Sequence, residues 1–590
     1  MYLRANIRKK NGKMHRYFSV VECRRLPEGK SVQRHVLYLG EINDAQEAAW
    51  RKTLTVFDEK SQMSQTLSLF PEDRVIPPDA LDAVQVKLKE MKLRRPRVFG
   101  NCWLGCYLWE LLELSGFWGE RLNGRRGDVS WTKVLELLVI NRLTDPGSEF
   151  RLHREWFDRT AMDELLSVTF AAAGKDRLYR CLDKILPHKE ELFSHLRKLW
   201  ESLFSAEFDV LLYDLTSTYF EGLCEEIPKA KFGHSRDKRY DCRQVIIALV
   251  ITADGLPLAY EVMPGNTSDK TTLPKFLKLI ESRYGKARRV WLMDRGIPKE
   301  EDITRMNKEG VQYLVGTPRG KLTELEEKFL SLSWREVREG VSVKLLNESG
   351  EVLVLAKSDG RRDKEKSIRC RKLKKLFKEL MKLRKRAPSR DKLLERLGVL
   401  KSEAGRAAGL VEIKIPADIT KEKFSWRLKA DKYKAAQRRA GHYLLRTNLT
   451  EEDPAVLWTR YVQLVEIESA FKCLKSDLAI RPIYHQIEKR VEAHILVAFI
   501  AYCLVVTLRK MLKPLAPGLT PREVLEKLSE IKMIDVWLPT MDGRWLVMPR
   551  YTEAGEEQKI LLNRLRLRLP LQPSPHIRST RSGEIERVIL

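Results

Sequence analysis

The spacing of hydrophobic and polar positions changes several times along the chain, and each change predicts a new structural segment. Short β-prone runs between glycine and asparagine turns predict a β-rich N-terminal module over residues 1–58. The polar, proline-containing residues 59–78 are typical of a linker. Leucines at three- and four-residue steps then predict a helical domain over residues 95–205. Residues 513–590 are expected to form a separate C-terminal region.

From Phe208 the pattern changes to apolar runs that are typical of buried strands. Three such runs come first, and two further strands then alternate with two helices. The expected strands are 208–215, 244–252, 258–263, 289–293 and 312–315, with helices over 272–284 and 299–308. Three strands followed by helix, strand, helix and strand is the order of an RNase H-like sheet. The sequence therefore predicts an α/β multidomain protein with an RNase H-like catalytic core.

The last helix of such a core is delayed by an insertion. We expect the core in two parts, residues 206–320 and 442–512, on either side of an insertion domain over residues 321–441. Apolar and polar residues alternate on both sides of Asn347–Gly350, which predicts a hairpin. The stretches 411–415 and 424–429 are typical of further strands. The insertion is therefore expected to be mainly β.

The delayed helix is predicted to run from Pro454 to about Leu478. Asp453 before it can cap the first turn, where proline is tolerated. Apolar residues at three- and four-residue steps mark its buried face, namely Leu464, Ile467, Phe471, Leu474 and Leu478. A second stripe steps by seven residues through Tyr461, Glu468 and Lys475. An acid beside a buried face needs a partner, and a bound metal ion would supply one.

The longest apolar run, Ile495–Leu508, lies between His494 and Arg509. It is shorter than the roughly 20 residues that cross a bilayer, so it predicts a buried helix. The first residues hold no apolar signal region. Nine cysteines without a Cys-x-x-Cys pair are typical of reduced thiols, which favours a cytoplasmic protein.

Charge indicates the class of partner. The formal net charge is +28 although 81 acids are present, which favours a globular protein that binds nucleic acid. Residues 361–390 hold 15 Lys or Arg and 3 acids, and phosphate contact is favoured there over a merely solvated helix face. The helical domain at 95–205 could be a packing module or could read a specific DNA end.

Three acids occupy comparable positions in the predicted core: Asp214 on its first strand, Asp294 at the end of its fourth, and Glu468 on its delayed helix. Each alone could be a turn or capping residue or an ion-pair partner. Together at one edge of a sheet they would repel unless cations lay between them, and carboxylate oxygens suit Mg²⁺, or Mn²⁺. Two such ions about 3.5–4 Å apart can promote phosphodiester displacement, which is nuclease-type chemistry.

The delayed helix carries a recognisable signature. The sequence resembles bacterial insertion-sequence transposases of the DDE cut-and-paste type, in which Tyr, Arg, Glu and Lys are separated by two, three and six residues. Those positions are Tyr461, Leu464, Glu468 and Lys475 here, so the arginine is absent. Further blocks over residues 205–512 are similar to one subgroup of these enzymes: Pro264–Asp269, Met293–Gly296, Val315–Pro318, Arg481–His485 and Glu492–His494.

The resemblance implies that Asp214, Asp294 and Glu468 are the catalytic, metal-binding triad and hold two Mg²⁺ ions. It implies that Tyr461 and Lys475 contact the cleaved strand. The partners would be double-stranded DNA, both the terminal inverted repeats of a transposon and the target, bound by a homodimer in the synaptic complex. Relatives with this signature cut through a hairpin intermediate.

Four other side chains are ambiguous. In some relatives a Trp on the insertion stabilises a flipped base, and Trp334 and Trp426 are candidates, although an aromatic residue in a strand is more often core. His485 and His494 are interpreted as packing residues, or as residues that support metal ligands, before being ligands themselves.

The leading hypothesis is a DNA transposase, an endonuclease and strand transferase acting at the bacterial nucleoid. An RNase H-like nuclease or resolvase without strand transfer is the competing enzyme. The third hypothesis is an inactive DNA-binding descendant.

Overall fold

The computed structural model describes most of the chain. The described residues are 2–10, 13–25, 31–40, 86–122, 129–268, 272–284, 289–294, 297–317, 328–329, 332–348, 350–386, 389–416, 424–450, 453–541 and 543–578. They form two compact units. The first comprises Met1–Glu207, Leu215–Thr267 and Glu468–Leu590, and the second comprises Phe208–Asp214 and Ser268–Ile467. The predicted linker 59–78 lies outside the described residues, and the six predicted domain boundaries stay predictions.

The first unit contains two small antiparallel sheets. Strands β1 (Tyr2–Lys10), β2 (Lys13–Arg25) and β3 (Ser31–Gly40) pair in that order, as predicted for the N-terminal module. The other sheet has the order β18-β17-β16-β4. Its strands are β4 (Lys92–Val98), β16 (Lys532–Pro539), β17 (Trp545–Tyr551) and β18 (His576–Arg578). β4 therefore joins the C-terminal region to the start of the predicted helical domain.

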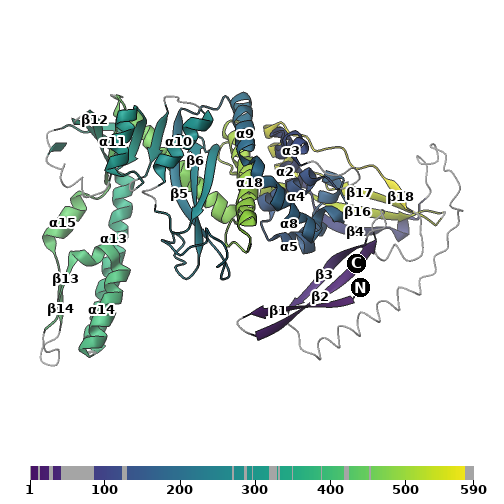
Figure 1. Ribbon diagram of the computed structural model, residues 1–590, viewed down its shortest axis with the longest axis horizontal. Helices are drawn as coiled ribbons and strands as arrows, with labels where there is room; N and C mark the ends of the chain where they lie inside the picture. Colours follow the sequence, from purple (N-terminus) through teal and green to yellow (C-terminus); the bar gives the residue numbers. More distant parts are fainter. Residues whose placement is uncertain are drawn as a thin grey trace. The chain divides into compact units, whose positions relative to one another are not determined.

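The first unit also contains α-helices (Figure 1). They are α2 (Gly100–Leu111), α3 (Leu114–Arg121), α4 (Trp131–Thr144), α5 (Glu149–Arg151), α6 (Phe157–Arg159), α7 (Met162–Leu166), α8 (Lys175–Ile185), α9 (Lys189–Phe204), α18 (Glu488–Leu515), α19 (Pro521–Leu528) and α20 (Glu556–Leu565). The segment 95–205 is thus helical after β4, as predicted.

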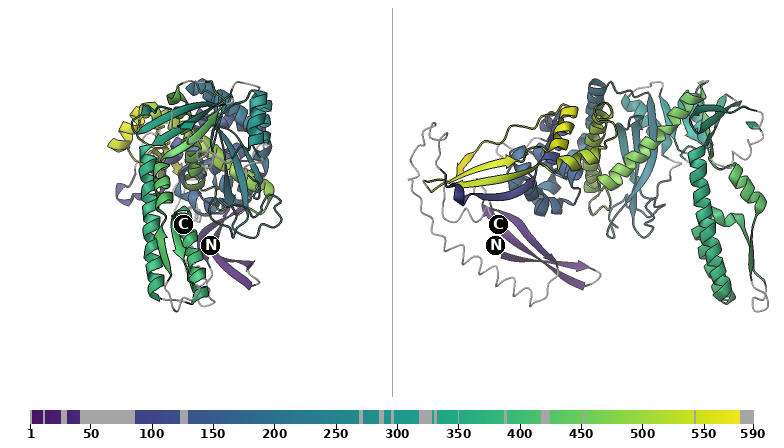
Figure 2. Two further views of the ribbon diagram at one scale, coloured as in Figure 1. Left: turned by 90° about the vertical axis from the view of Figure 1, so that its left-hand side faces the viewer. Right: turned by 180° about the vertical axis from the view of Figure 1, so that it is seen from behind.

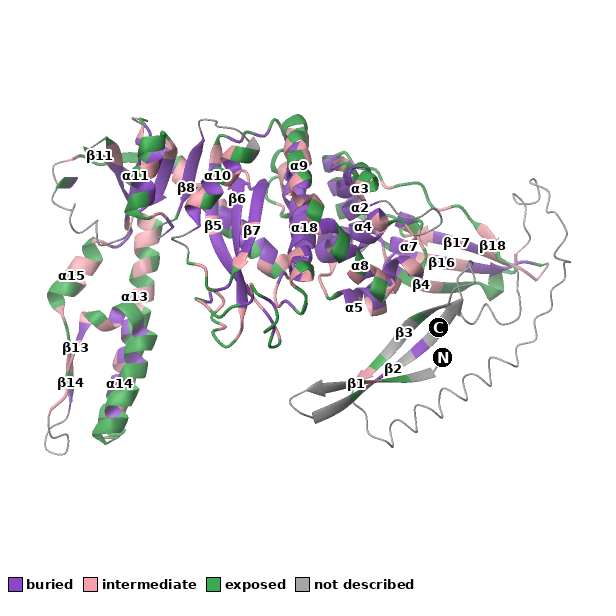
Figure 3. Ribbon diagram, in the orientation of Figure 1, coloured by how far each residue is buried: buried purple, intermediate pink, exposed green. Residues whose placement is uncertain are grey.

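Helix α18 is the core helix of this unit. It is long and apolar enough to cross a membrane by composition, but 94% of its apolar window is buried inside the protein, and Figure 3 shows it as a buried helix. Its hydrogen bonds to neighbouring elements include two between buried groups: Trp200 Nε1 of α9 donates to Thr507 Oγ1 at 3.1 Å, and Tyr502 Oη donates to the Gly255 carbonyl at 2.8 Å. The prediction of a buried helix is confirmed.

A mixed sheet has the strand order β10-β11-β12-β15-β9-β8-β5-β6-β7. β5 (Val210–Tyr219) runs through the boundary between the units. In the first unit, β6 (Gln244–Thr252) and β7 (Pro257–Pro264) form the predicted hairpin. In the second unit, β5 pairs in parallel with β8 (Val290–Met293), and β8 pairs in parallel with β9 (Gln312–Gly316).

The remaining strands belong to the second unit. β10 (Arg335–Arg338), β11 (Val341–Glu348), β12 (Glu351–Ser358) and β15 (His442–Thr447) are antiparallel, and β15 pairs with β9. Part of the predicted insertion therefore extends the central sheet. Helices α10 (Leu273–Tyr284) and α11 (Glu300–Glu309) follow β7 and β8 as predicted.

The prediction of a mainly β insertion is wrong for its middle part. Helices α13 (Asp359–Arg386) and α14 (Arg390–Ala404) run side by side in Figures 1 and 2, followed by α15 (Ala430–Arg438). The two predicted strands form only the short hairpin of β13 (Val411–Lys414) and β14 (Ser425–Leu428). Buried leucines at helical spacing, such as Leu373, Leu376 and Leu380, hold α13 to α14. This spacing is obscured in the sequence by the surrounding lysines and arginines.

The predicted single helix from Pro454 to Leu478 is divided. Asp453 caps it as predicted, because its Oδ1 accepts from the Ala455 amide at 3.0 Å. The helix then breaks into α16 (Pro454–Val462), α17 (Leu464–Lys472) and a π-helical turn over Cys473–Asp477. The spacing of apolar residues does not reveal these breaks, because hydrophobic residues on both sides of Gln463 are buried.

Candidate active site and nucleic-acid interface

Asp214 and Asp294 come from adjacent parallel strands. In β5 and β8, Tyr213 is the register partner of Met293, so each acid directly follows a residue of the same pair. Asp214 is half-buried and Asp294 is exposed. Two carboxylates at one edge of a sheet repel unless a cation lies between them, and oxygen donors fit a hard divalent ion. The donor chemistry therefore fits the predicted metal site.

The strand that carries Asp214 is fixed by its neighbours in the second unit. The Tyr213 hydroxyl donates to Thr272 Oγ1 at 2.7 Å, and its ring contacts Phe276 of α10 with centroids 5.0 Å apart. The Val290 amide donates to the Asp209 carbonyl at 2.8 Å at the start of the parallel pair. These contacts set the register that places the two aspartates at neighbouring positions.

Glu468 lies in α17 and is exposed. The residues beside it, Ile467, Ala470 and Phe471, are buried and anchor that helix. Glu468 begins a segment of the first unit, whereas both aspartates belong to the second. Its role as the third ligand of the triad stays a prediction.

Tyr461 lies in an aromatic group of the second unit. Its ring stacks on Tyr443 with centroids 5.7 Å apart, and Trp458 is 6.1 Å away. The side chain is half-buried, so its predicted contact with DNA would involve the edge of this group. Leu464, at the position where the signature has arginine, is also half-buried at the start of α17.

Lys475 has an acidic partner that the sequence did not indicate. Its Nζ donates to Asp237 Oδ1 at 2.9 Å, and Arg481 also pairs with Asp237 Oδ1. Burial lowers the pKa of Lys475, although Asp237 favours the charged form; the positive charges of Arg481 and Arg236 add to the lowering. The loop between β5 and β6 brings Asp237 to the lysine, and no local sequence signal would identify that contact.

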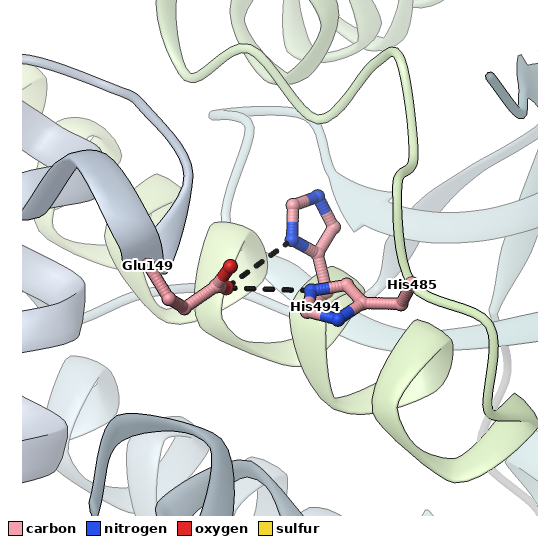
Figure 4. A group of neighbouring side chains, drawn as sticks. All are labelled: Glu149, His485 and His494. Atoms are coloured by element: carbon pink, nitrogen blue, oxygen red, sulfur yellow. Dashed lines mark ion pairs between the residues drawn. The ribbon is translucent and has the colours of Figure 1, made fainter. Parts of the chain in front are cut away.

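His485 and His494 meet the buried carboxylate of Glu149 (Figure 4). Glu149 Oε1 lies 3.3 Å from His485 Nε2 and 3.8 Å from His494 Nδ1. Burial disfavours the charged carboxylate, but contact with His485 outweighs that effect and holds the pKa of Glu149 well below its usual value. Sequence reasoning noted both histidines but missed Glu149, which lies far away in the chain.

Arg142 of α4 completes this group. Its Nη1 donates to the Ala479 carbonyl at 3.2 Å, and its Nη2 lies 3.4 Å from His494 Nδ1. His494 Nε2 lies 3.3 Å from the Ile480 carbonyl. A neutral His494 protonated on Nε2 can donate to Ile480 and accept from Arg142. Burial, reinforced by Arg142, lowers the pKa of His494 to about 4.

The Glu149, His485 and His494 donors lie within 4.8 Å of one another, a nitrogen and oxygen set that transition metals accept. Arg142 argues against such an ion, because its guanidinium already faces His494 Nδ1. A dication would add charge to a buried group in which Arg142 and Glu149 balance each other, and uncompensated buried charge is costly. The arrangement is better explained as a hydrogen-bonded network that joins α4, α5 and α18.

The two tryptophan candidates differ in environment. Trp426 packs against the hydrophobic core between α13 and α14, with the Arg384 guanidinium 4.7 Å from its ring centroid. Trp334 is 39% exposed and lies near two cations, with Lys344 Nζ 4.8 Å from its ring centroid. The environment of Trp334 fits a base-stacking role better than that of Trp426, and both roles stay predictions.

The sheet carries Asp214 within β5 and Asp294 directly after the adjacent parallel strand β8. This arrangement defines a class of protein with a candidate divalent-metal site. The sequence profile of the transposase DDE domain matches residues 207–504. This match spans half of the 590 residues, and the chain belongs to that family. DDE transposases use divalent metal ions.

Two further comparisons were made. No curated protein matches the sequence. Among solved structures, the chain is similar to one described as a cryo-EM structure of the piggyBac transposase synaptic complex with hairpin DNA. The TM-score is 0.34 and the identity 10%, covering 72% of this chain and 78% of the other.

Proposed function

We propose that this protein is a DNA transposase that cleaves DNA at transposon ends and joins the freed ends to target DNA. Asp214, Asp294 and Glu468 would hold two Mg²⁺ ions, or Mn²⁺. Membership of the transposase DDE domain family is the observation that carries the proposal. The placement of Asp214 and Asp294 after a register pair of parallel strands supports it.

The proposed core is RNase H-like. The strand order β7-β6-β5-β8-β9, with β6 and β7 antiparallel and β8 and β9 parallel to β5, agrees with the order expected from the sequence. In such a core the first and fourth strands present their acids at one edge, which explains why Asp214 and Asp294 would act together.

The reaction would consist of two phosphoryl transfers. Water attacks the phosphorus at the transposon end, the bond from phosphorus to the 3′ oxygen breaks, and the leaving oxygen takes up a proton to give a 3′ hydroxyl. That hydroxyl then attacks a second phosphodiester, in the opposite strand or later in the target, and displaces its 3′ oxygen. Bound divalent ions would lower the pKa of the attacking oxygen and stabilise the charge on the leaving one.

The proposed partner is double-stranded DNA at terminal inverted repeats and at the target, held by a homodimer in the bacterial cytoplasm. The basic surface of α13 supports a polyanionic partner. Among its exposed cations, Arg371, Lys374, Lys378 and Lys385 follow helical spacing along one face.

The test is Glu468→Gln in the full-length protein, with DNA that contains both flanks of the coding region. The variant should lose Mg²⁺-dependent cleavage but keep its affinity for the flanking DNA, because the change removes a ligand charge and little volume. Glu466→Gln, the same change in the same helix, is the matched control and should still cleave. Cleavage by Glu468→Gln would reject its role as a ligand.

Joined products distinguish the proposed activity from its alternative. Incubation of the wild-type protein with flanking DNA and a supercoiled target should yield covalently joined molecules. A nuclease or resolvase would give only cut products, and an inactive descendant would give neither.

A further inference from the structure

Two cations of the first unit converge on one carboxylate oxygen. Lys475 Nζ lies 2.9 Å from Asp237 Oδ1, and Arg481 pairs with the same oxygen. The side chains are 12%, 28% and 8% exposed for Lys475, Arg481 and Asp237. These three side chains are largely shielded from solvent and together carry a net charge of +1, and Arg236 adds a further positive charge nearby. Partly buried charge is costly unless it is balanced, so this group favours one further anion.

Arg481 is held in place by the backbone that follows it. The Ile483 amide donates to the Tyr219 carbonyl at 2.9 Å, and the Glu221 amide donates to the Ile483 carbonyl at 3.0 Å. Ile483 is thereby bridged to the chain that leaves β5, and Arg481 lies two residues earlier. The Arg481 guanidinium therefore extends from a segment that is hydrogen-bonded to the end of β5, the strand that carries Asp214.

The loop that carries Asp237 is also ordered by hydrogen bonds. The Arg236 amide donates to Ser217 Oγ at 3.1 Å, and the Arg239 amide donates to Ser235 Oγ at 3.1 Å. Arg239 itself pairs with Asp241, so it does not share Asp237. Both components of the group, the loop and the segment after α17, are thus fixed before any ligand arrives.

We propose that Lys475 and Arg481 form a binding site for one phosphodiester of the DNA, with Asp237 as the residue that positions both cations. Arg481 supplies the guanidinium that the signature would provide at the position of Leu464. This inference rests on the proposed function, since it assigns a DNA contact to the same protein. A guanidinium presents several N–H donors in a fixed plane, so Arg481 can bond Asp237 and a phosphate oxygen together.

The net charge of the site predicts how each variant should change the salt dependence of DNA binding. With Lys475, Arg481 and Asp237 ionised, the site carries +1 and can neutralise one phosphate. Arg481→Gln or Lys475→Gln brings it to zero, and Asp237→Asn added to Arg481→Gln restores +1. For duplex DNA, each neutralised phosphate contributes about 0.9 to the slope of log K against log salt concentration.

The experiment measures this slope for the full-length protein by fluorescence anisotropy, with a labelled duplex taken from the flanks of the coding region. Arg481→Gln and Lys475→Gln should each lower the slope by about 0.9. Across a fourfold increase in salt the affinity of either variant should therefore fall about 3.5-fold less than that of the wild type. Asp237→Asn combined with Arg481→Gln should regain the wild-type slope, and Arg481→Lys should keep it.

Arg490→Gln is the matched control. The Arg490 side chain is 27% exposed and pairs with one aspartate, Asp183, as Arg481 does with Asp237. The salt slope of the Arg490→Gln variant should equal that of the wild type. An unchanged slope for Arg481→Gln, or no recovery in the double variant, would overturn the phosphate site. If Arg481→Gln does not fold, Lys475→Gln decides, because an unchanged salt slope in that variant would overturn the site.

The outcome is separable from that of the proposed function. If Arg481→Gln lowers the salt slope and the double variant restores it, the phosphate site is established even if the wild-type protein neither cuts nor joins DNA. Conversely, if the wild type yields joined products and Arg481→Gln leaves the salt slope unchanged, the transposase function stands and the phosphate site is rejected.

Discussion

The buried histidine of α18 should make the first unit lose stability as the pH falls. His494 faces Arg142 from α4, Glu149 from α5 and His485 from the preceding segment, and its Nε2 approaches the Ile480 carbonyl. Burial and Arg142 lower its pKa from 6.5 to about 4. The unfolded chain therefore binds a proton near pH 6.5 that the folded chain takes up only near pH 4.

Linkage gives the magnitude. A group whose folded pKa is lowered in this way, when its neutral form is the one that fits the fold, costs stability as pH drops below the unfolded value. With 6.5 for the unfolded and about 4 for the folded state, the His494 contribution to the free energy of unfolding should fall by about 2 kcal/mol between pH 7.5 and 5.0. Burial raises the pKa of Glu136 in α4 to about 8, and that group contributes with the opposite sign. The lowered pKa of Glu149 has the opposite sign and keeps its stabilising charge throughout this range.

Hydrogen exchange of peptides from α18, read by mass spectrometry and corrected for intrinsic rates, measures the opening of this helix. Between pH 7.5 and 5.0, the protection of the wild type should fall about 30-fold relative to that of His494→Gln, which corresponds to the 2 kcal/mol. The glutamine side chain in His494→Gln is uncharged at both pH values. This variant should therefore lack the loss of protection that His494 causes, whatever its own stability. The reasoning fails if wild type and variant show the same pH dependence.

Two other predictions follow from the close approach at Gly265 and from the charge of α13. A Cβ at Gly265 would lie 2.1 Å from the Gln244 carbonyl oxygen and 2.4 Å from that of Lys231. Gly265→Ala should therefore destabilise the β6–β7 region by about 2 kcal/mol or more, as seen in exchange of its peptides. Gly398→Ala in α14, with nothing within 4 Å of its Cβ, should not destabilise its own helix. Replacing Arg371, Lys374, Lys378 and Lys385 by glutamine should lower the salt slope of DNA binding by up to about 3.6, whereas a slope equal to that of the wild type would mean that α13 does not contact DNA.

The sequence determined the elements whose signal is local. Period-two and continuous apolar runs identified β6, β7, β8 and β9 and the hairpin of β11 and β12 to within two residues at most ends. A long apolar run identified α18 as buried. The helix cap at Asp453 was also readable, because capping depends on a few adjacent residues.

Local patterns failed where charge or continuity masked the structure. The lysines and arginines of α13 obscured the leucine spacing that packs it on α14, so the insertion was expected to be mainly β. The apolar stripe along residues 454–478 suggested one helix, although the α-helix is interrupted at Gln463 and the backbone widens into a π-helical turn over Cys473–Asp477. A hydrophobic period reports which positions are buried, and it does not report whether one continuous helix buries them.

The chemistry divides in the same way. The sequence by itself determined which residue types occur in which elements: one acid on a strand, one at the end of another strand and one on a late helix, a lysine seven residues beyond the last acid, and no arginine at Leu464. Only the tertiary structure decided what those residues meet. It brought Asp237 to Lys475 and Arg481, and Glu149 and Arg142 to the two histidines. These contacts join residues far apart in the chain, and their energies depend on burial and distance, which no local pattern contains.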